Sequence, residues 1–191
     1  MNEFPDGWWL IATRRPSPHQ DARPADAIID MLVIHAISLP PQEFGGGFVD
    51  ALFMGTLDPA AHPALGTLAG VRVSAHFLID RGGNVVQFVP LSARAWHAGV
   101  SSFGGVPACN DRALGIELEG ADTCPFTAAQ YDRLAALCAA LFGALPALRL
   151  SRVIGHADIA PGRKTDPGPC FDWVRFRAAL AARLRGAQAP R

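Results

Sequence analysis

Two histidines end apolar segments of the chain, and an aspartate follows the second of them. His35 lies near the end of the run 31–38 (MLVIHAIS), His156 ends the run 152–156 (RVIGH), and Asp166 lies in the loop beyond it. Catalytic zinc typically takes three nitrogen or oxygen ligands from the protein and keeps a fourth position for water. Two neutral imidazoles and one carboxylate leave the ion a net positive charge, which lowers the pKa of that water and polarises a carbonyl group. The three residues are therefore candidate ligands of one zinc ion.

Spacing alone leaves this ligand set open. His35 is distant in sequence from the other two residues, and a single histidine at the end of a strand is more often a hydrogen-bonded core residue. Asp158 also follows His156 closely and competes with Asp166 as the third ligand. The pattern by itself does not choose between the two carboxylates.

Lys164 stands out because it is the single lysine of the chain. The other 16 of the 17 Lys and Arg residues are Arg, which indicates a bias that replaces lysine wherever a generic positive charge is enough. Lysine carries a compact ammonium whose pKa shifts on burial, whereas the guanidinium of arginine is planar and stays protonated. The retained lysine indicates a role that a guanidinium cannot fill, with chance retention as the alternative.

Two acidic residues lie on one predicted strand, 114–120 (LGIELEG). Because strand side chains alternate between faces, Glu117 and Glu119 share one face, while Ile116 and Leu118 share the other. A pair of acids on a central strand needs a polar place to point. The pattern does not say which of the two acids does chemistry.

The remaining elements must position these residues. Residues 1–30 carry several prolines and are predicted to form an irregular arm that Trp8 and Trp9 hold to the domain. A short helix is predicted at 48–54, and strands 71–80 and 84–90 are predicted to form a hairpin joined by 81–83. A longer helix is predicted from Thr127 to 143–146, with Gln130 in its capping box. The last predicted helix is capped by Asp172. The predicted loops are 57–66, with at most one helical turn, 95–111 and 157–170, and 186–191 is a predicted frayed tail.

The length of the chain predicts one domain. Its 191 residues, of which 50% are hydrophobic, can bury a sizeable core but are few for two ordinary domains. We expect a single α/β domain over residues 1–191, with a central mixed β-sheet of about five or six strands flanked by helices. The zinc site is expected in a groove at the strand ends.

Charge and hydropathy exclude several classes of partner. The 17 basic residues balance 17 acidic ones, so no large field attracts nucleic acid or an acidic membrane surface. The first residues lack the apolar run of a secretory signal, and no apolar stretch reaches the roughly 20 residues that span a bilayer, which predicts a cytoplasmic protein. The four cysteines are too far apart for a Cys-x-x-Cys motif and are predicted to be free thiols: Cys109, Cys124, Cys138 and Cys170.

Five segments of the chain resemble a known enzyme family. They are VIHAISLPPQEFGG, VSAHFLID, RAWHAGVSS, CNDRALGIELEG and IGHADIAPGRKTDPGPCFDWVRF, which begin at residues 33, 73, 94, 109 and 154. In this order and with almost no gaps they resemble the AmpD-type amidases, which act on anhydromuramyl peptides in cell-wall recycling. The resemblance extends from about residue 16 to 176 and covers nearly the whole chain. Its most specific part is GHADIAPGRKTDPGP.

The resemblance implies roles for individual residues. By their positions in the family motifs, His35, His156 and Asp166 bind the zinc ion, Glu117 is the catalytic acid and Lys164 the catalytic lysine. Hydrolysis of an amide needs an activated water, a stabilised oxyanion and a proton for the leaving amine. We assign zinc with Glu117 to the first task, zinc with Lys164 to the second, and protonated Glu117 to the third. Glu119 is left with a supporting or salt-bridging role.

Substrate contacts follow from the same resemblance. Arg72 and Arg163 are expected to receive carboxylates of the muramyl or peptide part, and Trp96 offers a flat face to a sugar ring. His97 is a further candidate substrate contact; it and His76 can alternatively orient a zinc ligand or make a structural hydrogen bond. The candidate substrate-binding residues are thus Arg72, Trp96, His97 and Arg163.

The chain departs from the family pattern at two positions. Ala36 stands where the family usually has an asparagine, and Ala108 stands where many relatives have an arginine that is expected to hold a carboxylate of the peptide. Neither position is a zinc ligand. Affinity for the peptide end of the substrate is therefore in question, while the metal site is not.

The expected function is a zinc-dependent amidase with one ion. It cleaves the bond between (1,6-anhydro-)N-acetylmuramic acid and L-alanine in cytoplasmic muropeptides, with an indirect effect on β-lactamase induction. Its substrate is a small molecule, and neither nucleic acid, membrane nor an obligate protein partner is implied. The alternatives are a non-catalytic muropeptide receptor of the same fold, which usually lacks a metal ligand, and an exported amidase, which needs a signal segment.

Overall fold

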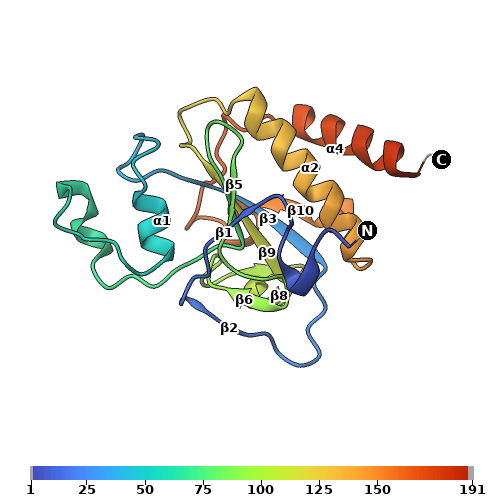
Figure 1. Ribbon diagram of the computed structural model, residues 1–191, viewed down its shortest axis with the longest axis horizontal. Coiled ribbons are helices and arrows are strands. Elements are labelled where there is room, and N and C mark those ends of the chain that lie inside the picture. The colour runs from blue at the N-terminus through green and yellow to red at the C-terminus, as the bar shows by residue number, and fades with distance from the viewer. Residues whose placement is uncertain (1, 189–191) are drawn as a thin grey trace.

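A six-stranded mixed β-sheet forms the centre of the protein in the computed structural model, which describes residues 2–188 (Figure 1). The strand order is β1-β5-β4-β9-β3-β10, and every neighbouring pair is parallel except β4 and β5. This confirms the predicted α/β fold with a mixed sheet of five or six strands. The strands are β1 (Thr13–Arg14), β3 (Met31–Ile37), β4 (Phe77–Ile79), β5 (Val85–Gln87), β9 (Ala113–Glu119) and β10 (Val153–Gly155).

Two long helices cover one face of this sheet. They are α2 (Ala128–Ala144) and α4 (Trp173–Gln188), which lie side by side in Figure 1 and pack on each other. Thr127 and Gln130 form the predicted capping box at the start of α2, and Asp172 accepts a hydrogen bond from the backbone of Arg175 at the start of α4. No helix in the described part of the chain is both long and apolar enough to cross a membrane.

Alternation along the strands divides apolar from chemical side chains. Phe77, Ile79, Ile116 and Leu118 point to the core beneath α2 and α4 and are at most 5% exposed, while Leu78 joins a second core under α1 (Phe48–Phe53). His35 on β3 and Glu117 on β9 are register partners on the face that α2 and α4 leave uncovered. The sheet therefore presents these two side chains next to each other.

The N-terminal arm is more regular than its prolines predict. β1 adds a parallel edge strand beside β5, and β2 (Gln20–Ala22) pairs with β6 (Ala93–Ala95) in a separate two-stranded sheet. Trp9 is 5% exposed and stacks on Phe4, whereas Trp8 is half-buried beneath the guanidinium of Arg14. Such short strands carry no periodicity of their own, and they form because the arm pairs with strands that the rest of the chain has built.

Other boundaries also differ from the predicted ones. Strands β4 and β5 are shorter than the predicted 71–80 and 84–90, since the chain before His76 leaves the sheet and Ser74 pairs with Trp96 instead. The regions predicted as loops contain short regular elements: α3 (His156–Ile159), the 3-10 helices Pro63–Leu68 and Cys109–Asp111, and the hairpin of β7 (Ser102–Phe103) and β8 (Val106–Pro107). Two further 3-10 helices are Pro5–Gly7 and Leu150–Arg152. Helix α4 continues to Gln188, and the rest of the predicted tail, 189–191, lies outside the described residues.

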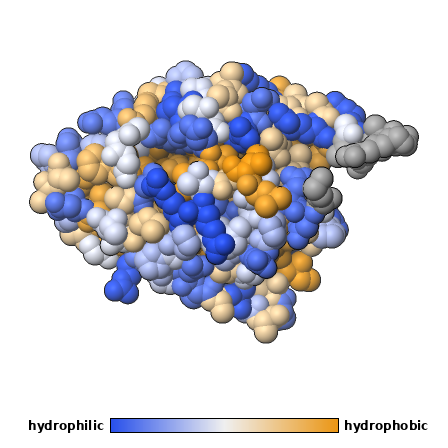
Figure 2. Space-filling model, in the orientation of Figure 1, coloured by the Kyte–Doolittle hydropathy of each residue, from blue (hydrophilic) through white to orange (hydrophobic). Residues whose placement is uncertain are grey.

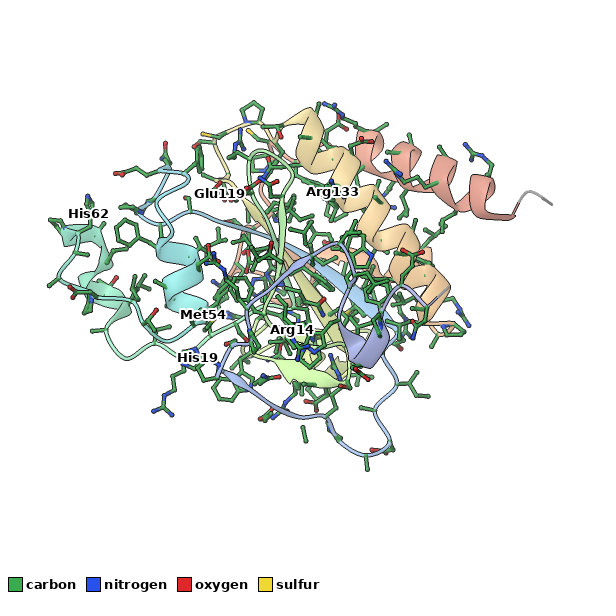
Figure 3. The ribbon with its side chains drawn as sticks, in the orientation of Figure 1. Arg14, His19, Met54, His62, Glu119 and Arg133 are labelled. Carbon is green, nitrogen blue, oxygen red and sulfur yellow. The ribbon has the colours of Figure 1, made fainter. Side chains whose placement is uncertain are left out.

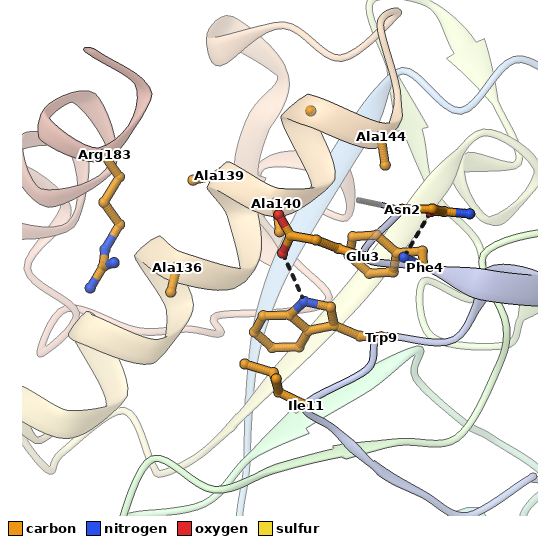
Figure 4. Close-up of a pocket in the computed structure, with 11 residues that line it drawn as sticks. Asn2, Glu3, Phe4, Trp9, Ile11, Ala136, Ala139, Ala140, Ala144 and Arg183 are labelled. Atoms are coloured by element: carbon orange, nitrogen blue, oxygen red, sulfur yellow. Dashed lines mark hydrogen bonds between the residues drawn. The ribbon is translucent and has the colours of Figure 1, made fainter. Parts of the chain in front are cut away.

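A surface hollow of about 700 Å³ separates the arm from α2 (Figure 4). Its floor is formed by small residues of α2, and Trp9 lies at its side with its indole N–H directed at Glu3. Figure 2 shows an apolar area at this place, on a face that is otherwise largely hydrophilic. The hollow is lined by none of the residues singled out for chemistry: Asn2, Glu3, Phe4, Trp9, Ile11, Ala136, Ala139, Ala140, Gly143, Ala144 and Arg183.

We predict that Trp9 carries most of the energy that holds the arm. Trp9→Ala removes a buried aromatic side chain and should lower the free energy of unfolding by about 3–5 kcal/mol. Trp8→Ala is the matched control, because it loses only a contact with Arg14 near the surface, worth about 1 kcal/mol or less. Urea denaturation of both variants measures the difference. Equal losses would show that the arm is not anchored through Trp9.

Candidate metal centre and active site

Three side chains converge at the carboxyl ends of β3 and β10. Nδ1 of His35 lies 3.0 Å from Nδ1 of His156, and Oδ2 of Asp166 lies 3.1 Å from each of these nitrogens. His35 comes from β3, and His156 begins α3 directly after β10. Asp166 reaches the site because its loop doubles back on α3, where the N–H of Ala157 donates to the Asp166 carbonyl. The predicted ligand residues are thus brought together.

The other candidate carboxylate is engaged elsewhere. Oδ2 of Asp158 accepts a hydrogen bond of 2.7 Å from the backbone N–H of Gly155 and so caps the short helix α3. The three groups that converge as possible metal ligands in the described chain are His35, His156 and Asp166. The geometry therefore favours Asp166 over Asp158 as the third ligand.

Hydrogen bonds on the far sides of the rings determine which nitrogen is free to bind a metal. Nε2 of His156 lies 3.2 Å from the carbonyl oxygen of Ala98, which can only accept, so Nε2 carries the proton. The lone pair of that ring is then on Nδ1, directed at the other two donors. Nε2 of His35 lies 3.0 Å from Nδ1 of His97. When Nε2 of His35 donates this hydrogen bond, Nδ1 of His35 is left free to bind a metal.

The spacing of the three donors fits a small divalent cation. Bonds of about 2.0–2.1 Å in a tetrahedral arrangement separate ligand atoms by about 3.3 Å, close to the 3.0–3.1 Å between these atoms. With the ring protons on Nε2, neither Nδ1 of a neutral imidazole has a hydrogen to donate, so hydrogen bonding alone does not satisfy the three lone pairs. Two imidazoles and a carboxylate are also ligands that zinc accepts.

Burial and the neighbouring groups set the protonation states of two candidate ligands. Burial lowers the pKa of His35 to about 4, although the adjacent Asp166 opposes this shift. Burial raises the pKa of Asp166, but the adjacent rings of His156 and His35 outweigh burial, and the net shift is downward. A neutral imidazole and an ionised carboxylate result near neutral pH.

The two glutamates of β9 have different surroundings. Oε1 of Glu117 lies 3.9 Å from Nδ1 of His35, and the buried Oε2 has no hydrogen-bond partner among residues 2–188. Burial raises the pKa of Glu117 well above its ordinary value; the charge of Asp166 adds to the shift, and Lys164 opposes it. Glu119, the last residue of β9, instead accepts hydrogen bonds from the backbone of Gly45 and Arg81 (Figure 3).

A pocket of about 170 Å³ opens over the three donors. Lys164 is exposed and lines this pocket together with Glu117, Trp96 and His97. The remaining lining residues are His35, Ala36, Ile37, Phe53, Val73, Ser74, His156 and Asp166. The candidate catalytic residues and two of the candidate substrate contacts thus face one cavity.

The two candidate arginines lie outside this pocket. Arg163 donates through Nη2 to the carbonyls of Ala98 and Val100, at 2.7 and 2.6 Å, so its guanidinium is used within the protein. Arg72 lines a neighbouring pocket of about 150 Å³ together with His19. His19 stacks on Trp96 at 6.0 Å between ring centroids and lies close to Gly55, just after α1. The wall between the two pockets is therefore the His19–Trp96 stack.

Sequence reasoning missed the residues that support the site from behind. Oδ1 of Asn110 accepts hydrogen bonds from the backbone of His97 and Ala98. Gly115 has no side chain because the His97 ring occupies the space, where a Cβ would lie 2.4 Å from the ring. The Gly in an otherwise apolar strand was the one signal of this close approach. A carbonyl acceptor such as that of Ala98 leaves no mark in the sequence.

The fold and the site together are compatible with a hydrolase that uses a metal ion: three donors are able to hold one ion, with a buried carboxyl group beside them. A search of protein families matches residues 24–169 to the N-acetylmuramoyl-L-alanine amidases. The chain belongs to this family.

Individual relatives extend the match over nearly the whole chain. A 1,6-anhydro-N-acetylmuramyl-L-alanine amidase AmpD of Salmonella typhimurium (strain SL1344) is 57% identical over 179 residues, 93% of this chain and 95% of the relative. A crystal structure of a selenomethionine AmpD derivative has a TM-score of 0.90 at 56% identity, covering 93% of this chain and 98% of that one. The amidase AmiD of E. coli, solved with anhydro-N-acetylmuramic acid-L-Ala-D-gamma-Glu-L-Lys, is 30% identical with a TM-score of 0.59 over 82% of this chain and 60% of that one.

Proposed function

We propose that this protein is a zinc-dependent amidase that cleaves the amide bond between 1,6-anhydro-N-acetylmuramic acid and L-alanine in muropeptides. The observation that carries the proposal is the convergence of two imidazole nitrogens and a carboxylate oxygen at 3.0–3.1 Å beside a buried glutamate. The names of relatives that are more than half identical over most of the chain support the substrate. The reaction adds water across the amide and releases the peptide with a free amino group.

His35, His156 and Asp166 would hold the zinc ion. When bound, zinc lowers the pKa of a water molecule and polarises the carbonyl of the amide. Burial keeps the imidazole of His35 neutral, and the outer hydrogen bonds of both rings leave their Nδ1 atoms directed to one point. The three ligands carry one negative charge in total, so the centre remains electrophilic with a divalent ion.

Glu117 is proposed to move the proton. Its carboxyl group lies beside the ligand triangle, and its buried Oε2 has no partner in the described chain, so both oxygens are available to the reacting groups. The upward shift of its pKa increases its basicity, which suits a carboxylate that accepts a proton from the attacking water. The protonated Glu117 then donates to the nitrogen of the leaving amine. Glu119 cannot share this task because its oxygens are bound to the chain at Gly45 and Arg81.

Lys164 is proposed to stabilise the negative charge that develops on the amide carbonyl oxygen. Its ammonium stands at the pocket that Glu117 and His97 also line. An ammonium near a divalent cation is disfavoured until negative charge develops between them, so the interaction is stronger in the transition state than in the ground state. This accounts for a retained lysine in a chain that otherwise uses arginine.

The substrate is proposed to extend from the metal pocket over Trp96 toward Arg72. The pocket of about 170 Å³ suits the lactyl and alanyl groups on either side of the scissile bond rather than a whole muropeptide. Trp96 presents a half-buried ring to the sugar, and the neighbouring pocket with Arg72 can receive a carboxylate. His97 completes the wall near the candidate ligands, while Arg163 is held through Nη2 by the carbonyls of Ala98 and Val100 outside this pocket.

The setting of the reaction belongs to the same proposal. We place it in the cytoplasm, in the recycling of cell-wall fragments, on the basis of the likeness to recycling amidases. The balanced charge of the chain suits a small-molecule substrate bound by local contacts, without nucleic acid, membrane or an obligate protein partner.

The decisive test is hydrolysis of a defined substrate. Purified protein loaded with one equivalent of Zn²⁺ is incubated with anhydromuramyl-L-Ala-γ-D-Glu-L-Lys, and free tripeptide is measured by chromatography. We expect release of tripeptide, its loss on treatment with a chelator, and its return when Zn²⁺ is restored. Intact substrate that remains bound to the metal-loaded protein would overturn the hydrolase in favour of a muropeptide receptor.

A second test addresses the role of Lys164. Lys164→Arg keeps the positive charge but moves it to a larger, planar group, so we expect zinc binding and folding to persist while kcat falls at least about a hundredfold. Arg185→Lys, on the exposed surface of α4, is the matched control for a Lys/Arg exchange and should retain wild-type turnover. Turnover of Lys164→Arg close to that of the wild type would contradict the proposed role.

A further inference from the structure

We propose that His97 and Ala98 form a brace that orients both histidine ligands at once, and that Asn110 is a positioning residue of the metal centre because it holds this brace. The proposal rests on the proposed function, since it concerns the same metal site. It assigns His97 a role behind the ligands in addition to any contact with substrate.

The first part of the brace is the side chain of His97. Its Nδ1 lies 3.0 Å from Nε2 of His35, and the two rings meet edge to face with centroids 5.0 Å apart. The His97 ring is held in place by its seat against Gly115, where no Cβ could fit. By accepting a hydrogen bond from Nε2 of His35, His97 fixes the ring of His35 and leaves its Nδ1 lone pair for the metal.

The second part of the brace is the carbonyl group of Ala98. Its oxygen lies 3.2 Å from Nε2 of His156 and 2.7 Å from Nη2 of Arg163, and both of these groups donate to it. The bond to His156 fixes the protonated nitrogen of that ring away from the metal. Two successive residues thus make the outer hydrogen bond of each imidazole ligand.

Asn110 determines where this dipeptide lies. Its Oδ1 accepts from the backbone N–H of Ala98 at 2.8 Å and from that of His97 at 3.3 Å. The backbone carbonyls around this dipeptide are bound by other groups, since Ser74 donates to Trp96 and Arg163 to Ala98 and Val100. The amide oxygen of Asn110 is the contact that holds the N–H groups of both His97 and Ala98.

The backbone of Asn110 is itself fixed. It lies in the 3-10 helix Cys109–Asp111, and its carbonyl oxygen accepts from Nη1 of Arg23, which also binds the carbonyl of Asp111, at 2.9 Å in each case. Nη2 of the same arginine donates to the carbonyl of Ala113, the first residue of β9. The position of the amide oxygen is thus tied to the strand that carries Glu117.

This arrangement predicts that Asn110 affects metal binding without touching a ligand. Loss of an outer hydrogen bond to a metal ligand typically weakens metal binding 10- to 100-fold. A loss at Asn110 is expected to weaken both outer bonds together, because its oxygen holds the backbone N–H groups of both His97 and Ala98. Replacement by a residue that keeps the acceptor should preserve them.

The test compares metal affinity among variants of the full chain. Asn110→Leu keeps the approximate volume and removes the acceptor, Asn110→Ser shortens it, and Asn110→Asp retains it. Thr127→Ala, which removes the cap of α2 far from the site, is the control for a loss of stability alone. Zn²⁺ affinity is measured by competition with a chromophoric chelator, and the visible absorption of the Co²⁺-loaded protein reports ligand geometry.

We expect zinc affinity to fall about 10- to 100-fold in Asn110→Leu and Asn110→Ser, with a changed Co²⁺ spectrum, and to stay within about threefold of the wild type in Asn110→Asp. Thr127→Ala should melt earlier and bind zinc normally. Wild-type affinity and spectrum in Asn110→Ser and Asn110→Leu would overturn the brace while leaving the metal centre intact. Failure of the wild-type chain itself to bind either metal would overturn the metal centre, and the brace with it.

Discussion

The candidate metal centre depends on three electron-pair donors that the protein holds close together, where their lone pairs repel one another. Nδ1 of His35, Nδ1 of His156 and Oδ2 of Asp166 lie within 3.1 Å of one another in a buried site, and neutral rings protonated on Nε2 have no hydrogen to place between them. A divalent cation bound by all three lone pairs would relieve the repulsion. The features around the site hold these donors together: the burial of His35, an outer hydrogen bond on each ring, and a loop that returns to α3.

The sheet supplies the geometry on which this convergence relies. β3 pairs in parallel with both β9 and β10, so their carboxyl ends meet at one edge, where His35, Glu117 and His156 are delivered. Alternation sends the intervening apolar residues to the core beneath α2 and α4 and leaves the other face for chemistry. Glu117 therefore stands beside the ligands as a consequence of strand register, while Glu119 lies two residues farther along and binds the loop backbone instead.

Much of this could be predicted from local patterns and from likeness to a family, and the rest could not. The buried strands around His35 and Ile116, the capping box of α2 and the three ligands carry signals in residue type or motif. β1 could not be foreseen because two residues have no periodicity and pair only with a strand formed elsewhere. The bonds of Arg163 to carbonyl groups and the brace at Asn110 depend on backbone atoms of distant loops, which the sequence does not encode as a local pattern.

The most direct test of the central claim is X-ray absorption at the zinc edge of the loaded protein. We expect one zinc ion with four light-atom ligands near 2.0 Å, two of them showing the multiple scattering of imidazole rings, and no sulfur ligand despite the four cysteines. A sulfur ligand, or a third imidazole such as that of His97 in place of water, would contradict a centre with three protein donors and a position open for the reaction.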